Sequence, residues 1–240
     1  MIIEPHISGA YGLLAGGVVS EPETHKILNF IDSNINENYY FIDVGASVGE
    51  FVLLMASKEK IVKVIAFEPN VKECGNIMKS ANLNSFSKII VNSKAVYDKE
   101  GVIEFNFSDK SLVGSSIFKD DINKKSHTEQ VDVTTLDEEL KNLTGNMIIL
   151  MDIEGAEFGA IKGGLNIINN IKPLIIFEYN HKSQKYFSLK EIRSVLNDDY
   201  EIYRLRTDGR LDLDFSKTQN LLAVNRKSLF YTHLHKLFIK

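Results

Sequence analysis

The chain has 240 residues, of which 44% are hydrophobic and 25% are charged, and its formal net charge at pH 7 is -4. This length and composition predict one α/β domain with modest additions and a sizeable core. The negative charge argues against a general nucleic-acid-binding protein, which needs a basic surface. A single cysteine, Cys74, excludes an internal disulfide framework and fits a reducing compartment, so we expect a cytoplasmic location. The N-terminus has no signal-peptide pattern, and no apolar run has transmembrane length.

Residues 1–38 are expected to form a helical arm that precedes the main domain. Glycines are interleaved with apolar residues over 1–20, and the apolar spacing over 22–35 predicts a helix. The arm either lies over a bound ligand as a lid or covers one face of a sheet, and the sequence leaves both hypotheses open. Tyr11 and Glu21 are its residues best suited to reach a ligand, and Tyr11 is our candidate for a substrate contact.

The stretch FIDVGASVG (41–49) predicts a strand that runs into a tight glycine turn and then into a helix N-terminus. Glycine permits turn geometries closed to other residues and a close approach of a ligand to the backbone. The helix N-terminus adds free N–H groups. We therefore expect a nucleotide-type cofactor pocket at the carboxyl edge of an open α/β sheet. The predicted cofactor contacts in this turn are Asp43, Gly45, Ala46, Ser47 and Gly49.

Two features indicate that this cofactor is S-adenosylmethionine rather than a dinucleotide. The turn lacks the second glycine of G-x-G, which makes room for a pyrophosphate. The carboxylate of Asp43 would repel a pyrophosphate but suits a ligand with a sulfonium and an amino group. The next predicted strand, 61–67, also ends at an acid, Glu68, in the place where ribose hydroxyls are bound, and Pro69 follows it as a further cofactor contact. Either acid alone would pass for a solvated loop residue, but the two together favour the cofactor pocket.

Further apolar strands continue the predicted sheet. They span 88–92, 146–151 and 173–177, with helices expected at 49–57, 71–82 and 188–197. An additional strand pair is expected at 101–107 and 131–133. The chain that follows the third strand passes the adenine in a doubly wound fold, so Ser93 and Ala95 are candidate cofactor contacts. The last two strands, 200–205 and 220–224, are joined by a short connection without a helix, which predicts an antiparallel pair.

Acids that end predicted parallel strands are the candidate catalytic groups. Asp43, Glu68, Asp152 and Glu178 all stand at such ends, and they are expected to converge because ligands in open α/β sheets bind at this edge. Asp152 and Glu178 would flank the methyl group. Asp152 is both a candidate cofactor contact and the first candidate for a general base or substrate anchor. His181 is another candidate base near neutral pH, although a lone loop histidine is more often simply solvated.

Residues that follow these two acids supply the other candidate substrate contacts. Glu154, Tyr179 and Asn180 stand on loops at the expected rim, where polar and aromatic side chains suit a carbohydrate. Glu157 opens the next helix, where an acid is also favoured by the helix dipole alone. A further hypothesis places Mg²⁺ on Asp152 and Glu178, where it would lower the pKa of a bound sugar diol. The sequence shows no clear third ligand for such an ion.

Several segments together carry a family resemblance. They are FIDVGASVG (41–49), AFEPN (66–70), SKAV (93–96), VDVTTLDEEL (131–140), MDIEGAE (151–157) and IIFEYN (175–180). Through them the chain resembles the FkbM-type S-adenosylmethionine-dependent methyltransferases over about residues 11–225. The resemblance implies a doubly wound Rossmann-like methyltransferase sheet, mainly parallel with an antiparallel last strand. It also implies O-methyl transfer to a hydroxyl acceptor, commonly on a sugar or a polyketide-like metabolite. One departure is Leu150, because relatives often carry a lysine two positions before the aspartate.

Two rival functions stay open at this stage. The first is an NAD(P)-dependent oxidoreductase or epimerase, against which the missing G-x-G and the expected antiparallel strand count. The second is a non-catalytic partner subunit that binds the cofactor without turnover. Either would share the α/β sheet, so the cofactor and the acceptor decide between them.

The chain ends in an amphipathic tail over residues 226–240, with apolar side chains at helical spacing among basic ones. We expect this tail to pack on its own domain or on a second subunit, since lone amphipathic helices usually pack within the protein. A peripheral membrane contact is the other hypothesis. The predicted division is therefore an arm (1–38), a methyltransferase domain (39–225) and a tail (226–240).

Overall fold

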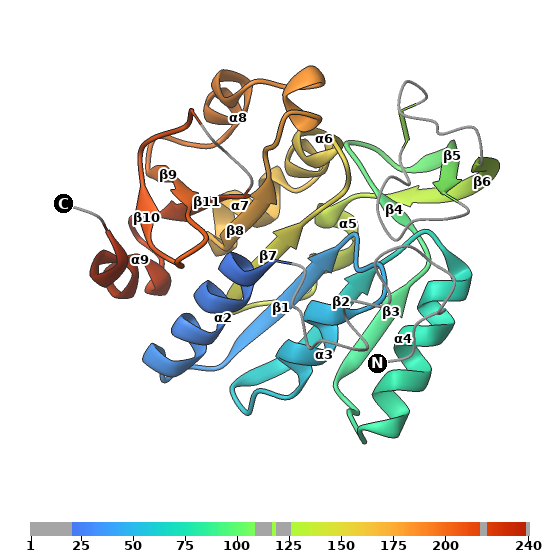
Figure 1. The fold of residues 1–240 in the computed structure, drawn as a ribbon, viewed down its shortest axis with the longest axis horizontal. Helices are drawn as coiled ribbons and strands as arrows, with labels where there is room; N and C mark the ends of the chain where they lie inside the picture. Colours follow the sequence, from blue (N-terminus) through green and yellow to red (C-terminus); the bar gives the residue numbers. More distant parts are fainter. Residues whose placement is uncertain (1–20, 109–116, 119–125, 217–219, 239–240) are drawn as a thin grey trace.

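The computed structural model describes residues 21–108, 117–118, 126–216 and 220–238. Its centre is an eight-stranded sheet in the order β10-β9-β11-β8-β7-β1-β2-β3 (Figure 1). The strands are β1 (Tyr39–Val44), β2 (Ile61–Phe67), β3 (Ile89–Asn92), β7 (Asn146–Met151), β8 (Leu174–Glu178), β9 (Tyr200–Leu205), β10 (Leu211–Asp212) and β11 (Asn220–Asn225). Neighbours from β8 to β3 are parallel. The strands predicted for this sheet at 61–67, 88–92, 146–151, 173–177, 200–205 and 220–224 match observed strands to within a residue at each end.

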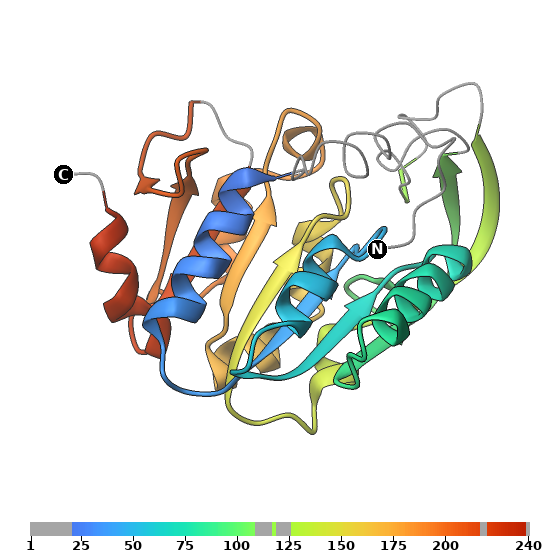
Figure 2. The same ribbon diagram turned by 60° about the horizontal axis from the view of Figure 1, so that its bottom comes forward.

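Helices cover both faces of this sheet, which is therefore doubly wound as predicted (Figure 2). One face, called here the α2 face, carries α2 (Pro22–Asn34), α3 (Glu50–Ala56), α4 (Val71–Leu83) and α9 (Leu229–Leu234). The other face carries α5 (Leu136–Leu140), α6 (Glu157–Lys162), α7 (Leu165–Ile171) and α8 (Leu189–Val195). The helix predicted at 22–35 is α2, so the described part of the N-terminal arm covers the sheet.

Alternation along the strands explains why both faces are apolar. Phe41 of β1 packs in the core under the α2 face, whereas Ile42 and Val44 pack in the core on the opposite face. Successive side chains of a strand point to opposite sides, so a parallel strand covered on both sides reads as a continuous apolar run. Asp43 interrupts this run and points to the α2 face, near the carboxyl end of the strand.

The end of the sheet is antiparallel, as the short final connection predicts. β11 lies between β8 and β9 and runs antiparallel to both. The connection also contains a short strand, β10, which pairs with β9 and which the sequence did not reveal. Two residues are too few for an alternating pattern to appear.

A second, three-stranded sheet stands beside the first, beyond β3 in Figure 1. It consists of β4 (Ala95–Val96), β5 (Gly101–Ser108) and β6 (Ser126–Thr134). The predicted pairing of 101–107 with 131–133 is confirmed, although β6 begins earlier than expected. Ala95 lies in the small core of this sheet.

The C-terminal tail packs on the domain from which it comes. α9 is followed by the short helix η3 (His235–Leu237), and Phe230 and Leu234 are buried in the core under the α2 face. The ring of Phe230 meets that of Tyr39 edge-on, with 6.4 Å between the ring centres. The apolar face of the tail is thus used inside the fold. Among the described helices, none combines the length and the apolar character that crossing a membrane requires.

Candidate active site

The acids predicted at the strand ends gather at one edge and on one face of the sheet. Asp43, Glu68, Asp152 and Glu178 lie at or just beyond the carboxyl ends of β1, β2, β7 and β8, which are all parallel. The strand residues two positions before them are Phe41, Ala66, Leu150 and Ile176, and all pack in the core under the α2 face. By alternation the four acids lie on that same face. The predicted convergence is therefore found in the structure.

The glycine turn after β1 is held against the neighbouring strands. The N–H groups of Gly45 and Ala46 both donate to the carbonyl oxygen of Phe67, at 2.9 and 3.1 Å. Gly45 has φ +89°, and a Cβ placed there would overlap the carbonyl oxygen of Asp152. Gly49, with φ +81°, leaves a Cβ only 2.8 Å from Ile77. Gly45 thus lets the turn pack closely against the end of β7, and Gly49 lets it pack against α4.

Asp43 is a buried carboxylate with one oxygen unpaired within the described part of the chain. Its side chain is in a residue only 3% exposed, and Oδ2 has no hydrogen-bond partner among the described residues. Burial first, and then the neighbouring carboxylates of Glu21, Glu68 and Glu50, together raise the pKa of Asp43 to about 8. An unpaired buried charge is costly, so this position calls for a cationic ligand or a proton.

Glu68 is fixed by two backbone groups. One carboxylate oxygen accepts from the N–H of Ser47 and the other from the N–H of Asn70, each at 2.8 Å. Burial raises its pKa to about 7, while these two hydrogen bonds oppose that rise. Each oxygen keeps a further lone pair, so Glu68 can still accept from a hydroxyl. It joins the turn after β1 to the turn after β2, where Pro69 is partly buried.

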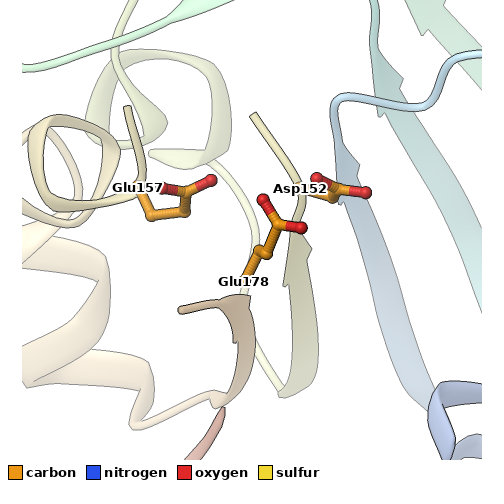
Figure 3. A group of neighbouring side chains, drawn as sticks. All are labelled: Asp152, Glu157 and Glu178. Carbon is orange, nitrogen blue, oxygen red and sulfur yellow. The ribbon is translucent and has the colours of Figure 1, made fainter. Parts of the chain in front are cut away.

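The strand-end acids form an acidic edge with two halves. Asp43 and Glu68, at the ends of β1 and β2, make up the first half, called here the β1 half. Three carboxylates at and after the ends of β7 and β8 make up the second half. Oxygens of Asp152, Glu157 and Glu178 all lie within 4.8 Å of one another, and in Figure 3 the carboxyl group of Glu178 lies between the other two. Burial, followed by the neighbouring carboxylates, raises the pKa of Asp152 well above its usual range. The same causes raise the pKa of Glu178 to about 8. Such a group holds protons near neutral pH or binds a cation.

Glu157 is the site residue whose role the sequence did not reveal. It is fully buried, and its carboxylate accepts from the N–H of Ile153 at 3.0 Å and of Gly155 at 3.1 Å. Burial raises its pKa to about 7. Glu157 therefore closes the loop after β7 and supplies the third carboxylate that the sequence did not show. The available signal was its place in the segment MDIEGAE, five residues after Asp152.

Glu178 is held by Asn180. The Nδ2 of Asn180 donates to Oε1 of Glu178 at 2.6 Å. The other carboxylate oxygen, Oε2, is buried and has no hydrogen-bond partner among the described residues. Like Asp43, Glu178 thus presents one unpaired oxygen at this edge of the sheet.

Glu21, at the start of α2, adds a further carboxylate to the same region. It accepts from Nδ2 of Asn220 at 2.7 Å and from the hydroxyl of Thr24 at 2.8 Å. Burial raises its pKa, and its charge raises the pKa of Asp43 and Asp152 in turn. The first residue of β11 therefore ties the first turn of α2 to the acidic edge.

Comparison with known proteins identifies the family. The model of the methyltransferase FkbM domain matches residues 43–204. The chain belongs to this family. This confirms the resemblance carried by the sequence segments, and the matched region runs from the end of β1 into β9 and includes Asp43, Glu68, Asp152, Glu157 and Glu178.

Two relatives put this FkbM domain in context. Methyltransferase 1 of Beauveria bassiana (strain ARSEF 2860) is 21% identical over 146 residues, which are 53% of this chain and 59% of the fungal protein. The crystal structure of methyltransferase FkbM from Methylobacillus flagellatus KT is 19% identical, with a TM-score of 0.54, over 89% of this chain and 58% of that one. The solved structure shows that the fold is the Rossmann-like methyltransferase fold. This chain spans about three fifths of the length of each relative.

The structure does not bring every predicted residue of this FkbM domain to the acidic edge. His181 is exposed and is not part of the three-carboxylate group. Tyr179 is 9% exposed, its ring packs against Phe187, and its hydroxyl accepts from the N–H of Leu189 at 3.0 Å. A residue with both its ring and its hydroxyl engaged inside the fold has a packing role. Loop position alone could not separate these two neighbours of Glu178.

Other predicted residues take varied places. Glu154 has its carboxylate 2.9 Å from Nζ of Lys182, so it joins the loop after β7 to the loop after β8. Ser93 is exposed just beyond β3. Leu150, where relatives often carry lysine, is 3% exposed and belongs to the core under the α2 face. Tyr11 lies outside the described residues.

Proposed function

We propose that this domain transfers a methyl group from S-adenosylmethionine to a hydroxyl oxygen of a sugar, glycan or related small metabolite. The observation that carries the cofactor assignment is the buried, unpaired oxygen of Asp43 beside the glycine turn. S-adenosylmethionine brings a sulfonium and an amino group to such an acid, which removes the cost of its burial. Glu68, with free lone pairs at the next strand end, suits the ribose hydroxyls.

The second half of the edge supports transfer to oxygen. A hydroxyl becomes a better nucleophile as its proton leaves, so a base with a pKa near neutral pH assists the reaction. Burial and neighbouring carboxylates give Glu178 a pKa of about 8 and raise that of Asp152. In the proposed step the acceptor oxygen attacks the methyl carbon in line, the carbon–sulfur bond breaks, and S-adenosylhomocysteine leaves as the neutral sulfide. The proton passes to one of these carboxylates.

The rivals are weaker on the same observations. A nicotinamide cofactor brings a pyrophosphate, which Asp43 and Glu68 would repel. The family membership and the antiparallel β11 also favour a methyltransferase. A cofactor-binding subunit without turnover would use the same acids at the ends of β1 and β2. Only a measured methyl transfer therefore distinguishes an enzyme from such a subunit.

Calorimetric titration with S-adenosylmethionine, S-adenosylhomocysteine and NADH is the deciding experiment. We expect micromolar binding of the first two ligands, lost in Asp43→Asn and Glu68→Gln and kept in Asp132→Asn, which changes an exposed acid of β6. Release of S-adenosylhomocysteine is then followed with a panel of neutral, amino and acidic sugars and small alcohols. Binding of NADH alone would refute the proposal. Binding without release on any acceptor would favour the non-catalytic subunit.

Mg²⁺ is a second way to neutralise the crowded carboxylates. Asp152, Glu157 and Glu178 offer oxygen ligands within 4.8 Å of one another, and hard cations prefer such oxygens. We propose that Mg²⁺ be titrated into the wild type and into Glu157→Gln. Millimolar or tighter binding that the variant loses would support an ion at these three carboxylates. Equal heats of titration in both proteins would mean that protons, and not Mg²⁺, neutralise the carboxylates.

The remaining parts of the proposal concern partners and location. We propose a small-molecule or glycan acceptor and no nucleic acid, on the basis of the net charge of -4. Self-association or membrane contact through residues 226–240 would have to use side chains other than Phe230 and Leu234, because these two are buried in the core. A cytoplasmic location stays the proposal that the single cysteine supports.

A further inference from the structure

The orientation of the Asn180 amide is fixed by its surroundings. Its Oδ1 accepts from the backbone N–H of Lys182 at 2.7 Å and of Ser183 at 3.1 Å. Backbone N–H groups only donate, so the atom that faces them has to be the amide oxygen. The nitrogen, Nδ2, is thereby turned toward Glu178, to whose Oε1 it donates at 2.6 Å.

This contact selects one oxygen of Glu178 and leaves the other. Oε1 is held by Asn180, whereas Oε2 is buried and finds no hydrogen-bond partner in the described parts of the chain. The charged groups that act on Glu178 from the surrounding elements are Glu21, Asp152, Glu154, Glu157 and Lys182. Four of these five are acids, so the surroundings of Glu178 mostly repel its carboxylate. A short hydrogen bond from a neutral donor fixes the carboxylate in a place where charge alone would displace it.

We propose that Asn180 is a positioning residue that holds Glu178 with Oε2 turned to the acceptor hydroxyl. The inference rests on the proposed methyl transfer and goes beyond it by assigning the base and its support. Asn180 itself touches neither the acceptor nor the cofactor in this assignment, which replaces our expectation of a direct substrate contact.

Asn180 supports the step in which Glu178 takes the proton of the acceptor hydroxyl. The acceptor O–H bond breaks and its proton goes to Oε2 of Glu178, while the electron pair of that bond stays on the acceptor oxygen. This oxygen forms the new bond to the methyl carbon, and the carbon–sulfur pair remains on sulfur. Misplacing a reacting group by about 1 Å can cost about a hundredfold in rate, so the support of Glu178 should appear in kcat.

The alternative is that Asn180 only caps the turn after β8. Its Oδ1 accepts from the N–H groups of Lys182 and Ser183, just before and at the start of the short helix η2 (Ser183–Lys185), and so holds the turn. Asn180→Asp separates these roles, because aspartate keeps the oxygen that caps the turn and loses the nitrogen that donates to Glu178. Ser183→Ala is the matched control, since it removes the hydroxyl that donates to Oδ1 at 3.4 Å and leaves the contact with Glu178.

The kinetic test uses the acceptor with the fastest release of S-adenosylhomocysteine in the panel above. We expect Asn180→Asp to lower kcat by about tenfold to a hundredfold, with the Kd for S-adenosylmethionine within about twofold of the wild type. Ser183→Ala should match the wild type in both. In a Glu178→Gln background, Asn180→Asp should cost nothing more, because it acts through the carboxylate. Equal losses in Asn180→Asp and Ser183→Ala, or additive losses with Glu178→Gln, would overturn the inference.

A second test needs no acceptor. In the wild type the side-chain amide protons of Asn180 should exchange slowly with solvent in nuclear magnetic resonance spectra, and Glu178→Ala should make them exchange fast. Fast exchange in the wild type would refute the contact on which the inference depends. A wild type that fails to bind S-adenosylmethionine while keeping slow exchange would refute the proposed function and leave the contact standing, so the two failures are distinguishable.

Discussion

The two halves of the acidic edge solve the same electrostatic problem in different ways. At the ends of β1 and β2, Glu68 is fixed by backbone N–H groups, and Oδ2 of Asp43 has no hydrogen-bond partner among the residues that the structure describes. At the ends of β7 and β8, three carboxylates crowd within 4.8 Å and one is held by a neutral amide. The first half has a fixed shape and lacks a positive charge. The second half holds more acid than one cation can neutralise, which leaves room for a proton.

This difference separates binding from chemistry along one edge of one sheet. A fixed cation such as a sulfonium stabilises the first half simply by binding. The second half is stabilised when one of its carboxylates takes up a proton, and an acceptor hydroxyl releases such a proton when it becomes a nucleophile. Substitutions in the first half should therefore weaken cofactor binding, and substitutions in the second half should slow methyl transfer. A substitution in the backbone turn that sets the spacing of the two halves should impair both.

The largest effect on folding is expected at Gly45, where the turn after β1 packs against the end of β7. A Cβ at Gly45 would overlap the carbonyl oxygen of Asp152, and φ is +89°. We expect Gly45→Ala to lower the free energy of unfolding by about 4 kcal/mol or to prevent folding. Urea unfolding followed by circular dichroism measures this. Gly75→Ala in α4 is the control, because its Cβ would meet nothing within 4 Å and alanine favours helix by up to about 1 kcal/mol. Equal stability of the two variants would show that the halves are not spaced by this contact.

The next effect is a dependence of stability on pH that arises in the β1 half. The pKa of Asp43 is raised from 3.8 to about 8, so the folded protein holds this proton when the unfolded chain has lost it. The contribution of Asp43 to the free energy of unfolding is therefore full below about pH 4 and declines as pH rises through about 8. We expect the wild type to lose up to about 6 kcal/mol more than Asp43→Asn across this window, by urea unfolding without ligand. Parallel curves for the two proteins would show that Asp43 keeps its ordinary pKa.

One variant in each half tests whether the first half serves cofactor binding and the second half serves chemistry. We expect Asp43→Asn to raise the Kd for S-adenosylmethionine about tenfold or more, since it removes the charge opposite the cofactor. Glu178→Gln should leave that Kd within about threefold and lower kcat about a hundredfold, the scale of a lost general base. Calorimetry gives the first quantity and release of S-adenosylhomocysteine the second. If each variant changed both quantities equally, the division between binding and chemistry would be wrong.

The sequence predicted the strands, the antiparallel ending and the place of the acids, because these depend on local patterns. Apolar runs set β1, β2, β7 and β8, and an acid after each run has only one edge to occupy. The turn glycines were also correctly placed, but for a partly different reason. We expected Gly45 to admit a ligand, and the structure shows it admitting the backbone of Asp152.

The contacts inside the site were beyond the sequence because they depend on how loops fold back. Glu157 stands at a helix start where the dipole alone explains an acid, and only the structure shows its carboxylate closing the loop after β7. Tyr179, Asn180 and His181 are consecutive, yet one packs, one holds Glu178 and one is exposed. Residue type predicted two substrate contacts, Tyr179 and Asn180, and one candidate base, His181, whereas the direction of the backbone decides which of the three side chains reaches Glu178.

The smallest effect is expected at the adenine side of the β1 half. Ser93 is exposed just beyond β3, and a single neutral hydroxyl contributes about 0.5–1.5 kcal/mol to binding when it pairs with a base. Ser93→Ala should therefore raise the Kd for S-adenosylmethionine about threefold and leave that for free methionine unchanged. Calorimetry with both ligands separates an adenine contact from a general loss of the pocket. No change for either ligand would remove Ser93 from the cofactor contacts and confine recognition to the charged groups at the ends of β1 and β2.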